Sequence, residues 1–568
     1  MATHVRSRLL RLLPALLLAG VVSTAPAATI TIVNLDGVGE GFNDATPASL
    51  VGGNTGTTVG QQRLFVFQQA ASIWGAILPS NIQIVVNSNF DPLTCTSTSA
   101  VLGSAGAAYI FRDFTNAPFP GTWYPKALAD KLANADLSPG SADINARFNV
   151  NIGTTGCMDG YSWYYGFDHN EGGAQIDLLV VLLHELGHGL GFQTFANGTT
   201  GALLSGYPDG FCRRIYDQAT GLHWNDENDT QRAASAINTF KLLWDGAATK
   251  VQAPQLLSHG RPVLRVNAPP AIVGDMAVGT AVFGPALGNP GVTGPVVLAN
   301  DGVTPTSDAC TALVNGAQIA GKIAMVDRGI CTFASKVKYC QDAGAIGVIV
   351  VDNVAGSPPA GMGGSDPTIT IPSVRVTLAD GTTLKAQLGS GLNVTLIADP
   401  ALLAGADGSG RAMLYAPNPY QSGSSVSHFD TSCLPNLLME PAINSDLTSN
   451  VDLTRYAFQD LGWQPATTGA PGGVPDLATA LHGNVPNPFK GSTAVSFELA
   501  RAGEIELGVY DLAGRLVRQL VHDRLPAGAH VTVWDGTDAR GQRVPSGVYF
   551  SHLKVAGEVR SRRMVVVE

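Results

Sequence analysis

Two histidines and a glutamate stand at a metal-binding spacing in LLHELGHGLGFQTF, residues 182–195. His184, Glu185 and His188 fit the pattern H-E-x-x-H. On a helix, residues four positions apart lie on one face, so both imidazoles can converge on one zinc ion. Glu185 can reach a water molecule activated by the metal without ligating the metal, which is where a general base belongs. The pattern therefore predicts zinc-dependent hydrolysis.

Residues 176–190, IDLLVVLLHELGHGL, form the element that must hold these side chains. The apolar run has no helix breaker before Gly187 and predicts a buried helix. Gly191 allows the positive φ that ends a helix and turns the chain away. Chance placement of the histidines on a buried helix is the weaker interpretation, because buried histidines need partners and a metal is a natural one.

The third zinc ligand is missing from this stretch. Three residues after Gly191 stands Thr194, whose neutral hydroxyl is a poor zinc ligand. Glu227 would complete a His-His-Glu site, but its surroundings, HWNDENDT, are typical of an exposed acidic loop. His428 lies in SSVSHFDTSCLPNLLMEPAI, where Met439 follows eleven residues later in a Met-Glu-Pro turn. The remaining candidates along the chain are His223, His259 and Asp217.

With that histidine and methionine included, the chain resembles the leishmanolysin-like metzincins. In that family a large insertion separates the H-E-x-x-H-x-x-G-F helix from its third histidine, and a methionine turn follows closely. The resemblance covers residues 28–265 and 403–464 and implies an α+β metzincin-like catalytic domain in two parts. It implies that Zn2+ is bound by His184, His188 and His428, that Glu185 is the base, and that Met439 lies in the turn beneath the metal.

The inserted segment, residues 266–402, consists of short apolar runs separated by Gly and Pro. Within it, GKIAMVDRGICTFASKVKYCQDAGAIGVIVVDN predicts strand, helix and strand, with Lys338 and Asp342 on the solvent side of the helix. This stretch resembles the protease-associated domain, an α/β module. The resemblance implies an accessory role in substrate handling or interaction, without a catalytic group; a passive spacer is the alternative.

A linker at residues 465–477 precedes the last domain, residues 478–568. Alternating strands broken by Gly-Arg, Asp-Gly and Pro-Ser-Gly turns predict an all-β sandwich there. The domain resembles the Ig-like domain of flagellar hook-capping proteins. Similar tails end many exported bacterial proteins and serve some of them as type IX sorting signals. Contact with secretion machinery and a stabilising or cell-surface-binding role both fit this domain.

The N-terminus predicts export. Arg6, Arg8 and Arg11 precede an apolar run that ends at residues 25–27, so residues 1–27 are a signal peptide by pattern. A membrane anchor is the alternative, but the apolar run is short for a bilayer. We expect a secreted, extracellular or cell-surface protein, exported from a bacterium, in which disulfides can form. The expected bridges are Cys95–Cys157, Cys212–Cys433 and Cys310–Cys331, with one thiol left over.

The bulk properties narrow the function further. A chain of 568 residues is too long for one compact core, so several domains are expected. The net charge is -10 and no stretch concentrates Lys and Arg, which excludes a nucleic-acid binder. The favoured function is a zinc endopeptidase acting on proteins or peptides, with no transmembrane segment after signal cleavage. The alternative is a non-catalytic adhesion or scaffold protein on a degenerate peptidase fold, against which the intact Glu185 argues.

Overall fold

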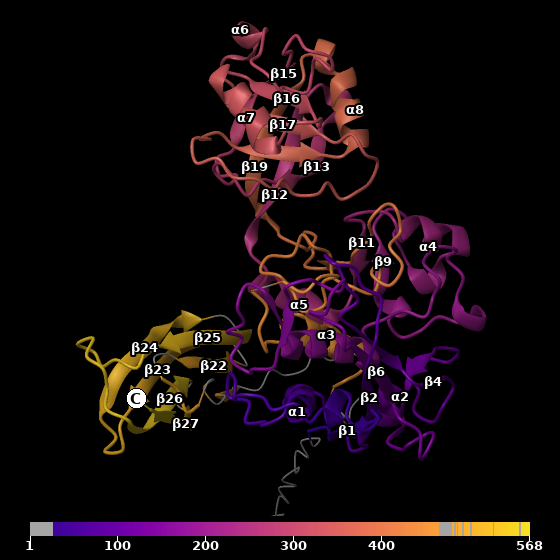
Figure 1. Cartoon of the computed structure of the whole chain (residues 1–568), viewed down its shortest axis with the longest axis vertical. Helices are drawn as coiled ribbons and strands as arrows, with labels where there is room; N and C mark the ends of the chain where they lie inside the picture. The colour runs from indigo at the N-terminus through magenta and orange to yellow at the C-terminus, as the bar shows by residue number, and fades with distance from the viewer. Residues whose placement is uncertain are drawn as a thin grey trace, which may run out of the picture.

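A computed structural model describes residues 27–464 except 445, together with residues 480–567 apart from short gaps at 482–483, 485–486, 491–492, 500–502, 526–527 and 556–557. The signal peptide expected at residues 1–27, except for its last residue, and the linker expected at 465–477 lie outside the described residues. Figure 1 shows a central region that holds the H-E-x-x-H helix, an upper region reached through two long strands, and a C-terminal β-region.

The central region begins with a four-stranded sheet and the helix that covers it. The helix α1 (Val59–Ile77) packs on this sheet, and the Thr58 hydroxyl caps it by accepting the Gln61 N–H. Apolar residues of α1, among them Phe67 and Trp74, are fully buried. The sheet has the order β1-β2-β6-β3, in which only β3 runs antiparallel to its neighbour. Its strands are β1 (Ile30–Asn34), β2 (Ile84–Asp91), β3 (Gly103–Ala107) and β6 (Ile144–Asn149).

The rest of the central region consists of short elements around the H-E-x-x-H helix, α3 (Leu178–Leu190). The other helices are α2 (Lys126–Ala133), α4 (Asp229–Ser235), α5 (Ala247–Leu256) and α9 (Thr454–Leu461). The 3-10 turns are η1 (Gly41–Asn43), η2 (Leu204–Gly206), η3 (Cys212–Arg214) and η4 (Trp224–Asp226). The small strands are β4 (Ile110–Phe111), β5 (Tyr124–Pro125), β7 (Ser162–Tyr164), β8 (Gln175–Asp177), β9 (Ile215–Asp217), β10 (Leu222–His223), β11 (Leu242–Trp244) and β20 (Ala412–Met413).

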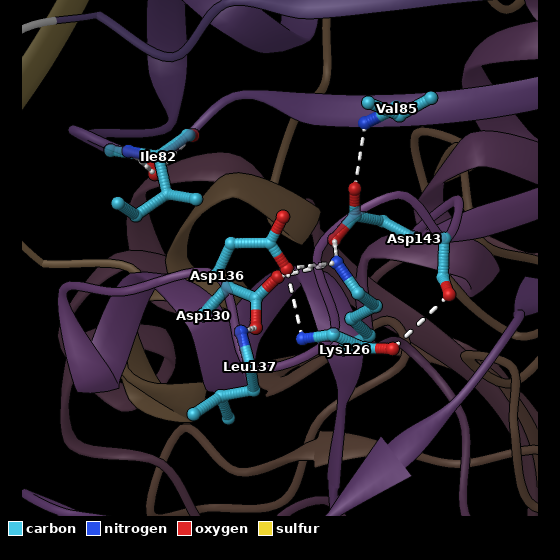
Figure 2. A network of polar contacts seen from close by, with 10 residues as sticks. Ile82, Val85, Lys126, Asp130, Asp136, Leu137 and Asp143 are labelled. Atoms are coloured by element: carbon cyan, nitrogen blue, oxygen red, sulfur yellow. Dashed lines mark hydrogen bonds and ion pairs between the residues drawn. The ribbon is translucent and has the colours of Figure 1, made fainter.

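A buried lysine connects α2 to the sheet (Figure 2). Lys126 donates from Nζ to three carboxylates, those of Asp130 at 2.7 Å, Asp136 at 3.0 Å and Asp143 at 3.1 Å. Asp143 also accepts the Val85 N–H of β2 through its other oxygen. Burial by itself would lower the pKa of Lys126, but the three carboxylates outweigh burial and raise the pKa. The lysine is therefore charged and holds the helix against the sheet.

The upper region is an eight-stranded sheet with apolar clusters on both faces. Its order is β13-β12-β19-β15-β16-β17-β18-β14, with β15 to β18 parallel. The strands are β12 (His259–Ala268), β13 (Gly274–Ala277), β14 (Gly279–Thr280), β15 (Val292–Leu298), β16 (Ile323–Asp327), β17 (Gly347–Val351), β18 (Ser373–Val376) and β19 (Asn393–Leu403). The helices and turns are α6 (Gly316–Ile319), α7 (Phe333–Asp342), α8 (Leu378–Ala386), η5 (Pro270–Ile272) and η6 (Leu388–Ser390).

The strand-helix-strand prediction for this region is confirmed by β16, α7 and β17. Alternation along β16 explains the two clusters, because Ala324 and Val326 face one side while Ile323 and Met325 face the other. On α7, Lys338 and Asp342 lie on the solvent side as expected and pair with each other, whereas Lys336 is buried.

The two long strands of the upper region explain how a large insertion leaves the central region intact. In β12 and β19, His259 lies opposite Leu403, so the chain leaves and returns at neighbouring points. The Ala404 N–H donates to the carbonyl of Ser258 at 2.9 Å. The residues after the insertion therefore continue where those before it stopped.

The C-terminal region is a sandwich of two antiparallel sheets, as its alternating strands predicted. Its core includes the buried side chains of Phe497, Leu507, Trp534 and Leu553. One sheet has the order β21 (Ala480–Leu481), β22 (Thr493–Leu499), β25 (Gly528–Trp534). The other has the order β24 (Leu516–Leu525), β23 (Gly503–Tyr510), β26 (Gly547–Val555), β27 (Glu558–Val566).

Two of the three expected disulfides are present. Cys95 bonds to Cys157 and Cys310 bonds to Cys331. The expected bridge between Cys212 and Cys433 was wrong, since both are free thiols buried in the central core. Cys212 begins η3 below Asp209, whereas Cys433 packs against Gly405, and sequence spacing carries no information on these positions. Within the described ranges, no helix has the length and apolarity needed to span a bilayer.

Candidate active site

The helix α3 is positioned by its two ends. Asp177 caps the start, because its carboxylate accepts the N–H groups of Leu179 and Val180. At the other end Gly191 has φ 127°, and its N–H donates to the carbonyl of His188 at 3.0 Å. A side chain is strained at that φ, so the glycine makes the turn that the sequence predicted.

Thr194 stabilises the chain after this turn through its hydrogen bonds. Its hydroxyl donates to a carboxylate oxygen of Asp209 at 2.8 Å, and the Phe195 N–H donates to the same oxygen at 2.7 Å. The Thr194 N–H donates to the hydroxyl of Ser427 at 3.2 Å. Thr194 thus binds the segment that carries His428.

His184, His188 and His428 converge although 240 residues separate the last two. The Nε2 atoms of His184 and His188 lie 3.1 Å apart, and the Nε2 of His428 lies 3.2 Å from each of them. Each ring is fixed through its other nitrogen, which is close to a backbone carbonyl. The acceptors are Leu438 for His184 at 2.7 Å, Phe192 for His188 at 2.8 Å and Ser424 for His428 at 2.7 Å.

These contacts fit a metal ion better than any arrangement of protons. Because each Nδ1 donates to a carbonyl, each Nε2 carries a lone pair, and three lone pairs cannot satisfy one another. At a zinc–nitrogen distance of about 2.0–2.1 Å and a tetrahedral angle, two ligand nitrogens lie about 3.3 Å apart. The observed separations are close to this value. Three imidazoles also leave a fourth position for water or substrate.

Burial keeps the three imidazoles neutral, as metal ligands must be. It lowers the pKa of His184 to about 4, against a smaller opposing effect of the Leu438 carbonyl. It lowers the pKa of His188 to about 3, and the neighbouring His184 adds to that effect. The pKa of His428 is lowered as well, first by burial and then by the other two imidazole rings.

Glu185 lies beside the three rings and is held by the edge of the sheet. The Ala105 N–H of β3 donates to its Oε2 at 3.0 Å. Burial raises the pKa of Glu185 to about 7, partly offset by this hydrogen bond. The carboxylate faces the same cleft as the histidines and does not belong to the ligand triangle.

The methionine turn lies directly under α3. A Cβ on Gly187 would lie 2.7 Å from the Sδ of Met439, so the glycine permits the close approach of the turn. Met439 is fully buried, and its carbonyl accepts the Phe429 N–H at 2.8 Å. The turn therefore connects α3 to the residue that follows His428.

The site opens into a cleft of about 770 Å3. Residues 100–105, at and before β3, form one wall. Tyr420 and residues 422–425 form another, and residues 441–443 a third. The positions of Ala105 and Tyr420 at the site could not be predicted from the sequence. A backbone donor leaves no signal in the residue type, and Tyr420 is brought to the cleft only by tertiary structure.

The rival third ligands lie in other contacts. His223 faces Asp245 at 3.0 Å, and the exposed His259 faces the carbonyl of Pro400 at 3.0 Å. Glu227 was expected in an exposed loop, but it is only 5% exposed. Burial raises the pKa of Glu227 to about 7. The hydrogen bond that it accepts from the Thr220 hydroxyl lowers the pKa, and the charge of Asp217 raises it.

Comparisons with family models identify the two accessory regions. Residues 292–384 match the PA domain, and residues 483–557 match the FlgD Ig-like domain. Neither match spans half of the chain, and neither includes His184, Glu185 or His188. The matches agree with the resemblances inferred from the sequence for the upper and C-terminal regions.

Curated relatives share only a short segment with the chain. The probable lipoprotein aminopeptidase LpqL of Mycobacterium tuberculosis is 34% identical over 110 residues, 18% of this chain and 21% of that protein. Leucine aminopeptidase 2 of Trichophyton rubrum is 36% identical over 95 residues, 16% of this chain and 19% of that protein. ER degradation-enhancing alpha-mannosidase-like protein 3 of Homo sapiens is 49% identical over 51 residues, 9% and 6% of the two chains. The chain thus spans about a fifth or less of these relatives, whose named activities differ, so the shared segment does not define the reaction.

Solved structures give a similarly partial likeness. A zinc aminopeptidase from Bacillus subtilis shows 22% identity over 26% of this chain and 35% of that chain, with a TM-score of 0.19. An aminopeptidase from Aneurinibacillus sp. strain AM-1 shows 24% identity over 25% and 31%, with a TM-score of 0.20. Scores this low support no argument about the central region.

Proposed function

We propose that the chain is a secreted zinc endopeptidase of the metzincin type that hydrolyses protein substrates. The observation that carries the proposal is the triangle of Nε2 atoms from His184, His188 and His428, 3.1–3.2 Å on each side, next to Glu185. In the part of the chain that the structure describes, no other group of three such side chains lies close enough to share an ion. The two disulfides support export to an oxidising compartment.

The proposed reaction divides between the ion and the chain. A bound zinc ion supplies Lewis-acid chemistry, lowering the pKa of a water molecule and stabilising the negative charge on the carbonyl oxygen. Glu185 takes the proton from the attacking water and returns it to the leaving amine. The Ala105 N–H orients the carboxylate for both transfers. The three carbonyls that accept the Nδ1 hydrogens keep the rings from rotating.

The edge of the sheet favours a polypeptide substrate. Strand β3 pairs with β6 on one side, and its residues 103–105 line the cleft beside Glu185. An extended peptide can add to such an edge through main-chain hydrogen bonds. A strand in this position passes the histidines with chain on both sides, which supports cleavage within a polypeptide.

Metal content and hydrolysis together test the proposal. Purified wild-type protein should hold about one zinc per chain, and His428→Ala should lose it, while the control His259→Ala keeps it. Glu185→Gln should keep zinc and lose casein hydrolysis. Full zinc in His428→Ala would exclude the proposed ligand set. Zinc-loaded wild-type protein that hydrolyses no protein substrate would favour the scaffold alternative.

Peptides with a free or a blocked amino terminus separate an endopeptidase from an aminopeptidase, the activity named for several relatives. An endopeptidase cleaves the acetylated peptide at an internal bond. Release of single residues only, and only from the free peptide, would replace the endopeptidase proposal by an aminopeptidase one.

A further inference from the structure

A second cavity, of about 470 Å3, adjoins the cleft. Ala100, Leu102 and Ile443 belong to the walls of both spaces. A peptide that lies along β3 beside the histidines can therefore place one side chain in the second cavity while its backbone stays in the cleft.

The walls of the second cavity are mainly apolar. Met158, Ile176, Val180 and Leu447 line it. Val180 lies one helical turn before His184 on α3, which places the cavity close to the reacting bond. An aliphatic chain of several carbons would bury its surface against these side chains.

One carboxylate in this cavity has no counter-charge. Glu171 lines the cavity, and its Oε2 is buried without a hydrogen-bond partner. Among the described residues it forms no ion pair. Asp177, the other acid in the lining, is already used, because it caps α3 and contacts His169 at 2.7 Å. The cavity thus presents one unpaired negative charge behind apolar walls.

We propose that this cavity is a specificity pocket for a lysine or arginine side chain next to the scissile bond, with Glu171 as its counter-ion. The inference rests on the proposed peptidase function of the same cleft. Lysine and arginine match both features, since their methylene stems cover apolar surface and their charged ends pair with a carboxylate. An acidic side chain would meet like charge, and an uncharged one would leave Glu171 unpaired.

The test measures kcat/KM on a peptide series in which each of the three positions on either side of the cleaved bond is lysine, norleucine or glutamate. At one position, wild-type protein should prefer lysine to norleucine. Glu171→Gln should reduce this preference about tenfold or more, the size of one hydrogen bond to a charged group. Glu171→Lys should shift the preference toward glutamate. Asp159→Asn removes a charge next to Met158 from a residue outside the lining and should leave the preference unchanged.

The outcomes are separable from those of the proposed function. Casein hydrolysis by wild-type protein with no lysine preference at any of the six positions would overturn the pocket and leave the peptidase intact. The same follows if the preference survives in both Glu171 variants. If Asp159→Asn also loses the lysine preference, the preference comes from the overall negative charge of this region and not from Glu171, which would likewise overturn the pocket. Absence of hydrolysis of every substrate would reject the peptidase on which the pocket rests.

Discussion

The carbonyl of Leu438 accepts a hydrogen bond from His184 at 2.7 Å and so fixes the first histidine of the helix through the methionine turn. The sulfur of the next residue, Met439, packs against Gly187, which lies about one turn of α3 after His184. A turn remote in sequence therefore sets both the orientation of a candidate ligand and the packing under the helix. This double role makes the turn testable by substitution.

Gly187→Ala should weaken zinc binding and lower the free energy of unfolding by about 1–3 kcal/mol, the usual cost of overpacking. The added Cβ would lie 2.7 Å from the Met439 Sδ, so the buried methionine side chain or the turn must shift. Isothermal titration with zinc and urea unfolding measure the two effects. In a double-mutant cycle, Met439→Ala should recover part of the loss by making room. Additive effects of the two substitutions would show that the contact does not couple helix and turn.

Lys126→Met should destabilise the central region by about 3–5 kcal/mol, because it leaves buried carboxylates without their cation. Lys126 and Asp143 are each 1% exposed, and Asp143 also binds strand β2. Lys338→Met removes an exposed pair of α7 and should cost at most about 1 kcal/mol. Chemical denaturation followed by far-ultraviolet circular dichroism compares the two. Equal losses would contradict a structural role for the buried network.

Local sequence patterns predicted the features of the site that depend on the backbone of a single helix and its turn. The spacing of His184 and His188 and the glycine turn at Gly191 follow from helix periodicity and φ, so they could be predicted from the sequence. The approach of His428 depends on the paired strands that close the insertion, and it came only from a family resemblance.

Two expectations were wrong because they depended on tertiary packing that a local sequence pattern does not contain. The acidic stretch around Glu227 predicted exposure, yet hydrogen bonds from Thr220 to its side chain and from Arg232 to its carbonyl hold that residue inside. The expected partners Cys212 and Cys433 both lie in the core, but burial in one core does not bring two sulfurs into bonding contact.

Stability should fall as the pH rises from about 5 to about 8, because of the carboxyl next to the methionine turn. Burial is the main reason that the pKa of Glu440 is raised from 4.5 to about 8. The hydrogen bond from the Leu437 N–H lowers this pKa, and repulsion from Asp430 raises it. A raised pKa means that the folded state holds the proton more tightly. The stabilising contribution of protonated Glu440 is complete below the pKa of the unfolded state and is lost as the pH rises through the pKa of the folded state.

Glu440→Gln should therefore flatten this decline and raise the free energy of unfolding at pH 8 on the order of 2 kcal/mol. Urea unfolding of zinc-free proteins at pH 5 and pH 8 measures the effect, so that metal binding does not enter. Glu504→Gln, at an exposed position of β23, is the matched control. An unchanged pH slope in Glu440→Gln would mean that the group ionises in the folded protein as it does in water.

Removal of the upper region should leave zinc binding intact and impair substrate handling. The strands β12 and β19 are antiparallel, and Arg261 lies opposite Asp399 close to the central region. Residues 262–398 can therefore be replaced by a two-residue Asn-Gly turn that closes the hairpin between these two residues. The insertion also contacts the segment that leads into the cleft wall, since the Ser357 N–H donates to the carbonyl of Asn418, two residues before Tyr420, at 2.8 Å. We expect about one zinc per chain and a raised KM for casein, with a smaller change for a short peptide. Ser357→Pro in the full chain removes that N–H and should raise KM in the same direction. Loss of zinc on deletion would show that the upper region is needed to bring His428 back to α3.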